Sequence, residues 1–255
     1  MKNISSASHI KTNEKVLDLI KIYFKQGNKL LDLGCGKGYL SRKVGDFIHN
    51  QGFNAKKYLL ASDIEKNAFE AFEIPFKQLN FDKKMPFKNK SFDLIYSVEV
   101  IEHLNSPYDL ILECSRILKP GGYLILSTPN ILHLGSRFKY FKSGFFDLFE
   151  PPSIHMKNRG RLCGHIMPLH MAYYSYALRL HGFSNIQLFS DKSKSFSIFL
   201  YAILFPWLKL NYCLEKKRIE KYDLGVYKEN KTTLKYMYSF IGLTSRSLIF
   251  VAQKK

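Results

Sequence analysis

The chain of 255 residues is long enough to bury a substantial hydrophobic core, which excludes a peptide or a disulfide-stapled miniprotein. Hydrophobic residues make up 46% of the chain and charged residues 24%, as in ordinary folded globular proteins. Lys and Arg number 39 against 21 Asp and Glu, and the net charge of +18 favours an anionic partner, namely nucleic acid, an acidic membrane surface or a phosphorylated substrate.

Cysteine usage and the apolar segments indicate the compartment. No CxxC pair and no Cys/His cluster with metal-ligand spacing occurs among Cys35, Cys114, Cys163 and Cys213. We therefore expect a reduced, cytoplasmic protein without a metal site. Residues 1–11 lack the apolar run of an export signal. The most apolar stretch, 196–210, is interrupted by Pro206 and is shorter than the roughly 20 residues of a spanning helix, so we expect that it does not cross a bilayer unaided.

Helical and strand patterns alternate through the first half of the chain. A helix is predicted from about Asn13 to Phe24, and Gly27, shortly after it, is a residue that ends helices. The elements predicted next are, in order, a strand over 29–33, a helix over 39–50, strands over 58–62, 76–81 and 92–98, a helix over 108–118 and a strand over 123–128. Such an order is typical of a parallel sheet with helices on both faces.

The second half is less regular. Residues 131–170 mix aromatic, proline and basic residues, and they predict a helix plus a long loop of the kind that often forms a functional lid. A helix over 172–181 and strands over 185–189 and 248–252 follow, and an insertion over 192–244 separates the last two strands. No linker composition divides the chain, so we predict a single α/β domain over 1–255 with seven strands and two elaborations.

A glycine-rich turn joins the first strand to the next helix. Glycine occupies every second position, which lets the backbone approach a ligand closely, and the turn consists of Gly34, Cys35, Gly36, Lys37 and Gly38. A dinucleotide fingerprint would have the GxGxxG spacing, whereas this turn has GxGxG and follows Asp32. The carboxylate would repel a pyrophosphate and suits a ligand with a cationic amino group. The alternative is a tight turn without a ligand.

Two further strand ends carry polar side chains. Asp63, followed by Ile64, ends the second strand, where a carboxylate can accept hydrogen bonds from both hydroxyls of a ribose. The alternative role for Asp63 is a helix cap. Asn80, Phe81 and Asp82 close the third strand, and either polar residue could bind an adenine amino group with the aromatic ring beside the base.

Four motifs in this order resemble class I S-adenosylmethionine-dependent methyltransferases, of the group that includes ubiquinone-biosynthesis-type and glycan-cluster enzymes. They are LLDLGCGKGYLS (30–41), ASDI (61–64), MPFKNKSFDLIYSVEVIEHL (85–104) and RILKPGGYLILSTPN (116–130). A weaker similarity covers 164–183. The resemblance implies a Rossmann-like fold, with a seven-stranded, mostly parallel sheet, and S-adenosylmethionine as the cofactor. It does not specify the acceptor.

The resemblance also implies roles for individual residues. Asp32 and the glycine turn would hold the methionine portion of the cofactor, and Asp63 the ribose hydroxyls. The sulfonium side of the pocket would be lined by Ser97, Val98 and Glu99.

Two histidines are candidate general bases for abstracting a hydroxyl proton, because an unperturbed imidazole titrates near neutral pH. They are His103, close after Glu99, and His165 in the predicted lid. The alternatives are a structural histidine at 103 and an ordinary loop residue at 165. His170 is a further rival.

The insertion combines aromatic and cationic residues over 196–221, as an element at a membrane interface does. The alternatives are a core or substrate-pocket helix and a homodimer contact. We therefore expect O-methylation of a small or membrane-associated acceptor, either a surface-glycan sugar or a lipid or quinone intermediate. The expected location is cytoplasmic, with peripheral contact at the inner face of the membrane.

Two other functions compete with this expectation. The charge of +18 allows an RNA methyltransferase, although no RNA-binding module is recognisable in the sequence. A catalytically inert protein that binds S-adenosylmethionine and scaffolds a partner is the second alternative, and the intact motifs argue against it.

Overall fold

The computed structural model describes residues 4–154 and 164–255. The chain groups into two compact units. The first, the sheet unit, contains Met1–Thr128, Leu178–Gln187 and Ile249–Lys255. The second, the helical unit, contains Pro129–Ala177 and Leu188–Leu248. The single domain inferred from the sequence stays a prediction.

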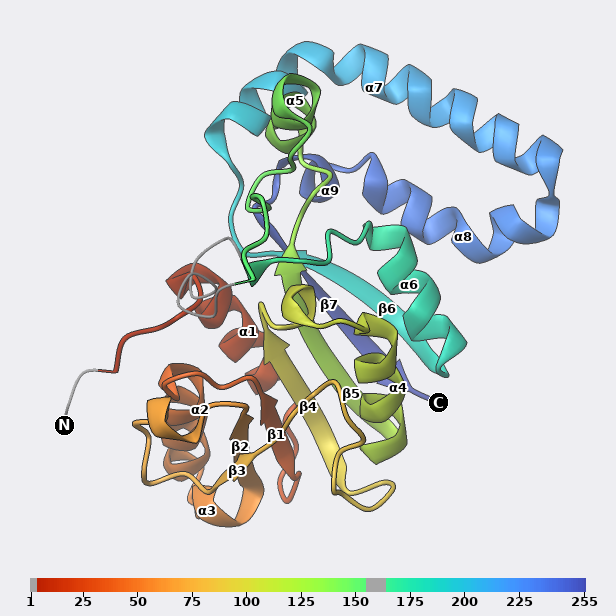
Figure 1. The fold of residues 1–255 in the computed structure, drawn as a ribbon. Helices are drawn as coiled ribbons and strands as arrows, with labels where there is room; N and C mark the ends of the chain where they lie inside the picture. The colour runs from red at the N-terminus through yellow and green to blue at the C-terminus, as the bar shows by residue number, and fades with distance from the viewer. Residues whose placement is uncertain (1–3, 155–163) are drawn as a thin grey trace. The chain divides into compact units, whose positions relative to one another are not determined.

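The sheet unit contains most of the regular alternation of strand and helix (Figure 1). Its elements are α1 (Ile10–Tyr23), β1 (Leu30–Leu33), α2 (Tyr39–Asn50), α3 (Ala55–Tyr58), β2 (Leu59–Asp63), η1 (Lys66–Ala68), β3 (Phe76–Gln78), β4 (Phe92–Val98), η2 (Ile101–His103), α4 (Pro107–Ile117), β5 (Leu118–Pro129), β6 (Phe183–Ser190) and β7 (Ser247–Lys254). The last three strands extend by a residue or more into the helical unit.

The strands form one seven-stranded sheet in the order β3-β2-β1-β4-β5-β7-β6. Parallel pairing joins β3 to β2, β2 to β1, β1 to β4 and β4 to β5. Figure 1 shows β7 running opposite to β5, so the sheet is mixed but mostly parallel. The predicted Rossmann-like fold class is confirmed. The strand order reverses between β1 and β4, and in such sheets ligands bind at the carboxyl ends of the strands beside this point.

Burial explains why the central strands are so apolar. All four residues of β1 are buried, and six of the seven residues of β4 are buried. The connections β1-α2-β2 and β4-α4-β5 leave the centre in opposite directions, and right-handed crossovers then place α2 and α4 on opposite faces. This arrangement covers both faces of the central strands.

The helical unit contains α5 (Leu134–Ser143), most of α6 (Met171–Leu180), α7 (Ser195–Tyr222), α8 (Leu224–Met237) and α9 (Phe240–Thr244). Its small core consists of Leu134, Leu208 and Leu243, against which Leu200, Tyr201 and Leu204 pack. The predicted insertion corresponds to α7, α8 and α9. Residues 155–163 of the predicted lid lie outside the described residues.

The expected interruption at Pro206 is wrong, because α7 continues through it for 28 residues. A proline inside a helix removes one backbone hydrogen bond, and the packing of one side of α7 onto α5, α8 and α9 compensates for this loss. Among the described residues α7 is the one helix that is long and apolar enough to cross a membrane. Only 11% of its most apolar stretch of 18 residues is buried.

Candidate cofactor site

Asp32 is a carboxylic acid buried in the centre of the sheet. It lies on β1 with an exposed fraction of 2%, and its Oδ2 accepts a hydrogen bond of 2.6 Å from Ser41 Oγ. Burial raises the pKa of Asp32 to about 7; the hydrogen bond from Ser41 and the nearby hydroxyl of Tyr96 lower it, and the nearby charge of Asp63 raises it further. The group therefore changes charge near neutral pH, and a cationic ligand would favour its ionised form.

The glycine turn is held against the end of β2 by its backbone. The N–H groups of Gly34 and Cys35 both donate to Ser62 O, at 2.9 and 3.0 Å. Gly38 has a φ of +88°, and a Cβ there would lie 2.7 Å from both Ala71 and Phe69. A Cβ on Gly34 would collide with Val100. Glycine is therefore required both for the backbone conformation and for space.

Asp63 lies at the carboxyl end of β2, next to this turn. Its Oδ2 accepts a hydrogen bond from Gly36 N at 2.8 Å, and its Oδ1 accepts one from Glu65 N at 3.1 Å. Because each carboxylate oxygen has two lone pairs, both can still accept a ribose hydroxyl. The neighbouring Ile64 is 56% exposed, so it is available to contact a ligand.

The candidate adenine-binding residues follow β3. Leu79 N donates to Asp63 O at 2.9 Å, which places this segment beside the ribose candidate. Asp82 accepts hydrogen bonds from the backbone and side chain of Asn105, both at 3.0 Å, and Asn80 Oδ1 accepts from Asp82 N. Phe81 and Asp82 line a separate cavity of about 430 Å³. The role of these residues in adenine binding stays a prediction.

The end of β4 contributes three predicted residues in different ways. Val98 lines the same cavity as Asp32. Ser97 is fully buried and donates from Oγ to Leu33 O at 2.9 Å, which ties β4 to β1. Glu99 adopts a left-handed backbone with a φ of +53°, and its N–H donates to Ser127 Oγ at 3.0 Å. Such strain in a residue other than glycine is typical of functional sites.

A cavity in the sheet unit brings several of these residues together. Its lining includes Asp32, Gly34, Cys35, Gly36 and Val98. Burial, together with the carboxylates of Asp32 and Asp63, raises the pKa of the Cys35 thiol, so this cysteine is not an activated nucleophile. The cavity is also lined by residues that no sequence motif predicts, namely Asn13 and the four residues Ser5, Ser6, Ala7 and Ser8.

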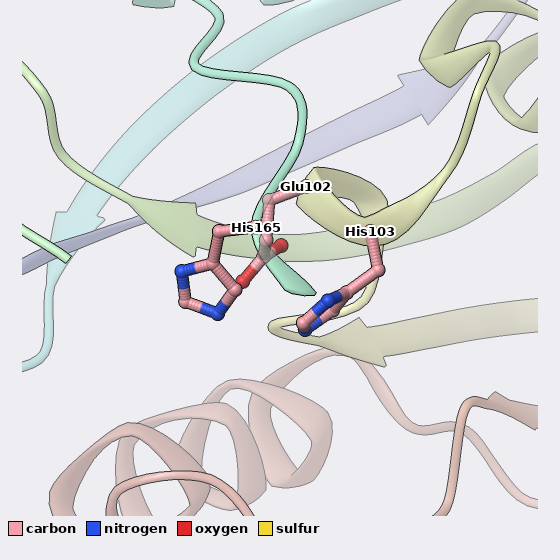
Figure 2. A group of neighbouring side chains, drawn as sticks. All are labelled: Glu102, His103 and His165. Atoms are coloured by element: carbon pink, nitrogen blue, oxygen red, sulfur yellow. The ribbon is translucent and has the colours of Figure 1, made fainter. Parts of the chain in front are cut away.

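The two candidate bases belong to different units. Figure 2 shows Glu102 and His103 on η2, which follows β4; Glu102 is fully buried and His103 is exposed. His165, drawn in the same figure, comes from the helical unit, where its Nδ1 lies 2.7 Å from Leu148 O. Both catalytic roles stay predictions.

The fold is Rossmann-like, and the glycine turn that follows Asp32 resembles the cofactor-binding turn of class I S-adenosylmethionine-dependent methyltransferases. Residues 31–126 match the family described as "Methyltransferase domain". The chain is similar in fold to a SAM dependent methyltransferase from Archaeoglobus fulgidus, with a TM-score of 0.56 and 16% identity over 95% of this chain and 94% of that one.

Two curated relatives match the same part of the sequence. A ubiquinone biosynthesis O-methyltransferase of Nitrosococcus oceani is 31% identical over 105 residues, which are 41% of this chain and 44% of that protein. A cycloartenol-C-24-methyltransferase of Arabidopsis thaliana is 34% identical over 126 residues, 47% of this chain and 36% of that protein. The matches thus span less than half the length of either relative. They confirm the resemblance to methyltransferases.

Proposed function

We propose that the protein transfers a methyl group from S-adenosylmethionine to an oxygen of a small, membrane-associated acceptor. The observation that supports methyl transfer most directly is the buried Asp32 beside the glycine turn, with Asp63 hydrogen-bonded to the same turn. The cofactor supplies a methyl group activated by its sulfonium. Everything else in the reaction is positioning and proton transfer by the protein.

Each part of the site has a distinct task in this proposal. Ionised Asp32 pairs with the ammonium group of the cofactor, and Asp63 accepts hydrogen bonds from the ribose hydroxyls. The glycine turn allows close approach of the backbone. His103 Nε2 or Nδ1 takes the proton of the acceptor hydroxyl, with His165 as the alternative base. Alignment of the oxygen with the methyl carbon provides most of the rate enhancement.

The exposed face of α7 supports a membrane-associated acceptor. Six large apolar residues follow one another at intervals of three or four and are each between 47% and 60% exposed; we call them the α7 stripe: Phe196, Phe199, Ile203, Trp207, Leu210 and Leu214. The other side of the helix packs inward through Ser197, Tyr201, Leu204 and Leu208. A helix that packs by one side and exposes an apolar stripe on the other suits the plane of a membrane interface.

The charges around the stripe suit an anionic surface. Basic residues follow the stripe at the end of α7, and they are Lys216, Lys217, Arg218 and Lys221. Arg218 pairs with Glu215, and Lys216 lies 4.0 Å from Glu220. Peripheral contact through 196–221 with the inner face of a membrane would present a lipid-linked sugar or a lipid or quinone intermediate to a cytoplasmic enzyme.

A transfer experiment tests the acceptor class. Protein incubated with methyl-labelled S-adenosylmethionine is offered either a lipid extract or total RNA, and the products are partitioned between solvents. The proposal predicts label in the lipid phase that hot hydriodic acid, which cleaves methyl ethers, releases as methyl iodide. Label that ribonuclease releases would instead support the RNA alternative, which the charge of +18 allows.

Absence of label in both fractions, with cofactor binding intact, would support the inert scaffold. The alternative partner of the α7 stripe is a second copy of the chain. In that case the protein is a homodimer in solution, and substitutions in the stripe dissociate it.

A further inference from the structure

We infer that the helical unit contains a second binding site, a cavity between α7 and α8 that takes the hydrocarbon chain of a lipid with an anionic head group. The residues that line this cavity belong to the helical unit and lie outside the four sequence motifs. The inference deepens the proposed function and rests on it for the class of ligand, because a lipid is the acceptor proposed above.

The cavity is long and follows two helices. Its volume of about 550 Å³ is within the range of small-molecule sites. Figure 1 shows α7 and α8 running in opposite directions, and Asp223 joins them. The lining residues extend over 215–222 on α7 and 226–237 on α8, which correspond to about 10 Å and about 16 Å of helix. This shape suits an extended chain better than a compact ring system.

The walls of the cavity are mainly apolar. Ile219 on α7, Leu234 and Met237 on α8 and Ala172 on α6 all line it. Leu234 is buried, with an exposed fraction of 6%, whereas Val226 is 42% exposed and lies at the open side. A chain that enters past Val226 and reaches Leu234 leaves water, and this burial of apolar surface is the main favourable contribution to binding.

Polar side chains gather near Glu215. The Nε and Nη2 atoms of Arg218 lie 2.8 and 2.7 Å from Glu215 Oε2. Because a guanidinium has five N–H donors, this pair leaves others for the oxygens of a phosphate or carboxylate. Burial and the nearby carboxylate of Glu215 raise the pKa of the Tyr238 hydroxyl, which therefore stays neutral and able to donate a hydrogen bond.

The charge of the two helices favours an anionic head group. Residues 215–238 include seven basic and four acidic residues. This positive surplus attracts an anionic amphiphile and disfavours a cationic one. An apolar cavity with a cationic rim thus matches both ends of an anionic lipid.

A fluorescent amphiphile tests the inference in the full chain. Dansyl-aminoundecanoic acid has one alkyl chain and a carboxylate, and its fluorescence rises in an apolar cavity. Val226→Trp narrows the open side and should weaken binding of this probe at least about tenfold. Leu224→Trp adds the same ring to the same helix at a position that is 53% exposed and outside the cavity, so it is the matched control and should bind within about twofold. Urea unfolding checks that both variants fold.

Two competitors distinguish the head group from the chain. Dodecyl phosphate, added below the concentration at which it forms micelles, should displace the probe more strongly than dodecyl maltoside, which has the same chain and an uncharged head. Arg218→Gln should weaken binding of dodecyl phosphate about fivefold and leave that of dodecyl maltoside unchanged. Equal displacement by the two competitors in the wild type would contradict an anionic head group.

Equal binding of the probe by Val226→Trp and Leu224→Trp, or a wild type that binds no probe, would overturn the inference. Neither result would affect binding of S-adenosylhomocysteine or transfer of the methyl label, which are measured separately. A wild type that binds the probe but neither binds S-adenosylhomocysteine nor transfers methyl groups would instead contradict the proposed function.

Discussion

At the scale of single residues, the charge of Asp32 links cofactor binding to pH. Because its pKa is raised to about 7 in the ligand-free protein and a cationic ligand requires the ionised form, affinity for S-adenosylhomocysteine should rise about tenfold per pH unit below pH 7 and then level off. Titration calorimetry between pH 5.5 and 8 measures this slope. Asp32→Asn should bind weakly with a flat profile, and a sloping profile in that variant would assign the pH dependence to another group.

The same pKa has the opposite consequence for the ligand-free fold. An unfolded aspartate ionises near 3.8, so between about pH 4 and 7 the unfolded state carries fewer protons at this position than the folded state. The contribution of Asp32 to stability therefore falls as pH rises through that window, and the cofactor should restore it.

Alanine substitutions at Gly38 and Gly52 distinguish the energetic cost of backbone strain from the cost of steric overlap. Both have positive φ, +88° and +83°, but a Cβ at Gly52 meets nothing within 4 Å, whereas one at Gly38 overlaps Ala71 and Phe69. Gly52→Ala should cost about 1 kcal/mol and Gly38→Ala about 2–4 kcal/mol of unfolding free energy in urea titrations. Equal losses would show that the space around Gly38 relaxes freely.

At the scale of secondary-structure elements, a buried polar network fastens α7 to α5 within the helical unit. His133 is 1% exposed; its Nδ1 lies 3.0 Å from Ser197 Oγ and its Nε2 lies 3.1 Å from Asp147 Oδ2. Ser197 Oγ also accepts from Gly135 N at 3.0 Å, and Lys194 pairs with Asp147. The start of α7 is therefore held by hydrogen bonds as well as by the small apolar core.

Removing one hydroxyl tests that network. Ser197→Ala leaves the partly buried N–H of Gly135 without its acceptor and should cost about 1–2 kcal/mol, with faster hydrogen exchange at the start of α7 and α5. Ser195→Ala is the control, because Ser195 is exposed and lies two residues before Ser197; it should change stability little. Equal effects of the two substitutions would show that the network does not anchor α7.

How well the sequence predicts each element depends on what holds it in place. The bounds predicted for α2 and β4 are confirmed because their apolar periodicity is strong and local. β5 begins at Leu118, earlier than predicted, because pairing of Leu118 with Phe92 across a register shift extends the strand through Pro120 and two glycines. The continuation of α7 through Pro206 depends on packing with other helices, which no local pattern reveals.

The candidate site likewise contains residues that local motifs predict and residues that only the fold brings together. Motif spacing predicts Asp32, Gly36 and Asp63, because adjacent parallel strand ends meet at one edge of the sheet. Asn13 and Ser5–Ser8 were missed, since only the fold brings a segment that precedes the first helix against the end of β4. A polar residue on the buried side of the predicted helix, Asn13, was the available signal.

At the scale of the whole molecule, the charge of +18 and the α7 stripe make separable contributions to membrane binding. The protein should sediment with anionic vesicles and less with neutral ones, and added salt should weaken binding without abolishing it, because apolar burial is not screened. Replacing Phe199 and Trp207 together by Glu should reduce binding at least about tenfold. Leu112→Glu, which changes an exposed leucine on α4, is the control. Failure of the wild type to sediment at any salt concentration would contradict peripheral membrane contact.

The central claim is that the glycine turn and Asp63 bind S-adenosylmethionine, and calorimetric titration with S-adenosylhomocysteine tests it most directly. The account predicts micromolar binding by the wild type and its loss in both Asp63→Ala and Gly36→Val. The first variant removes the carboxylate that accepts from Gly36 N, and the second places a side chain in the turn. Folded wild-type protein that binds no S-adenosylhomocysteine, or variants that bind as the wild type does, would contradict it.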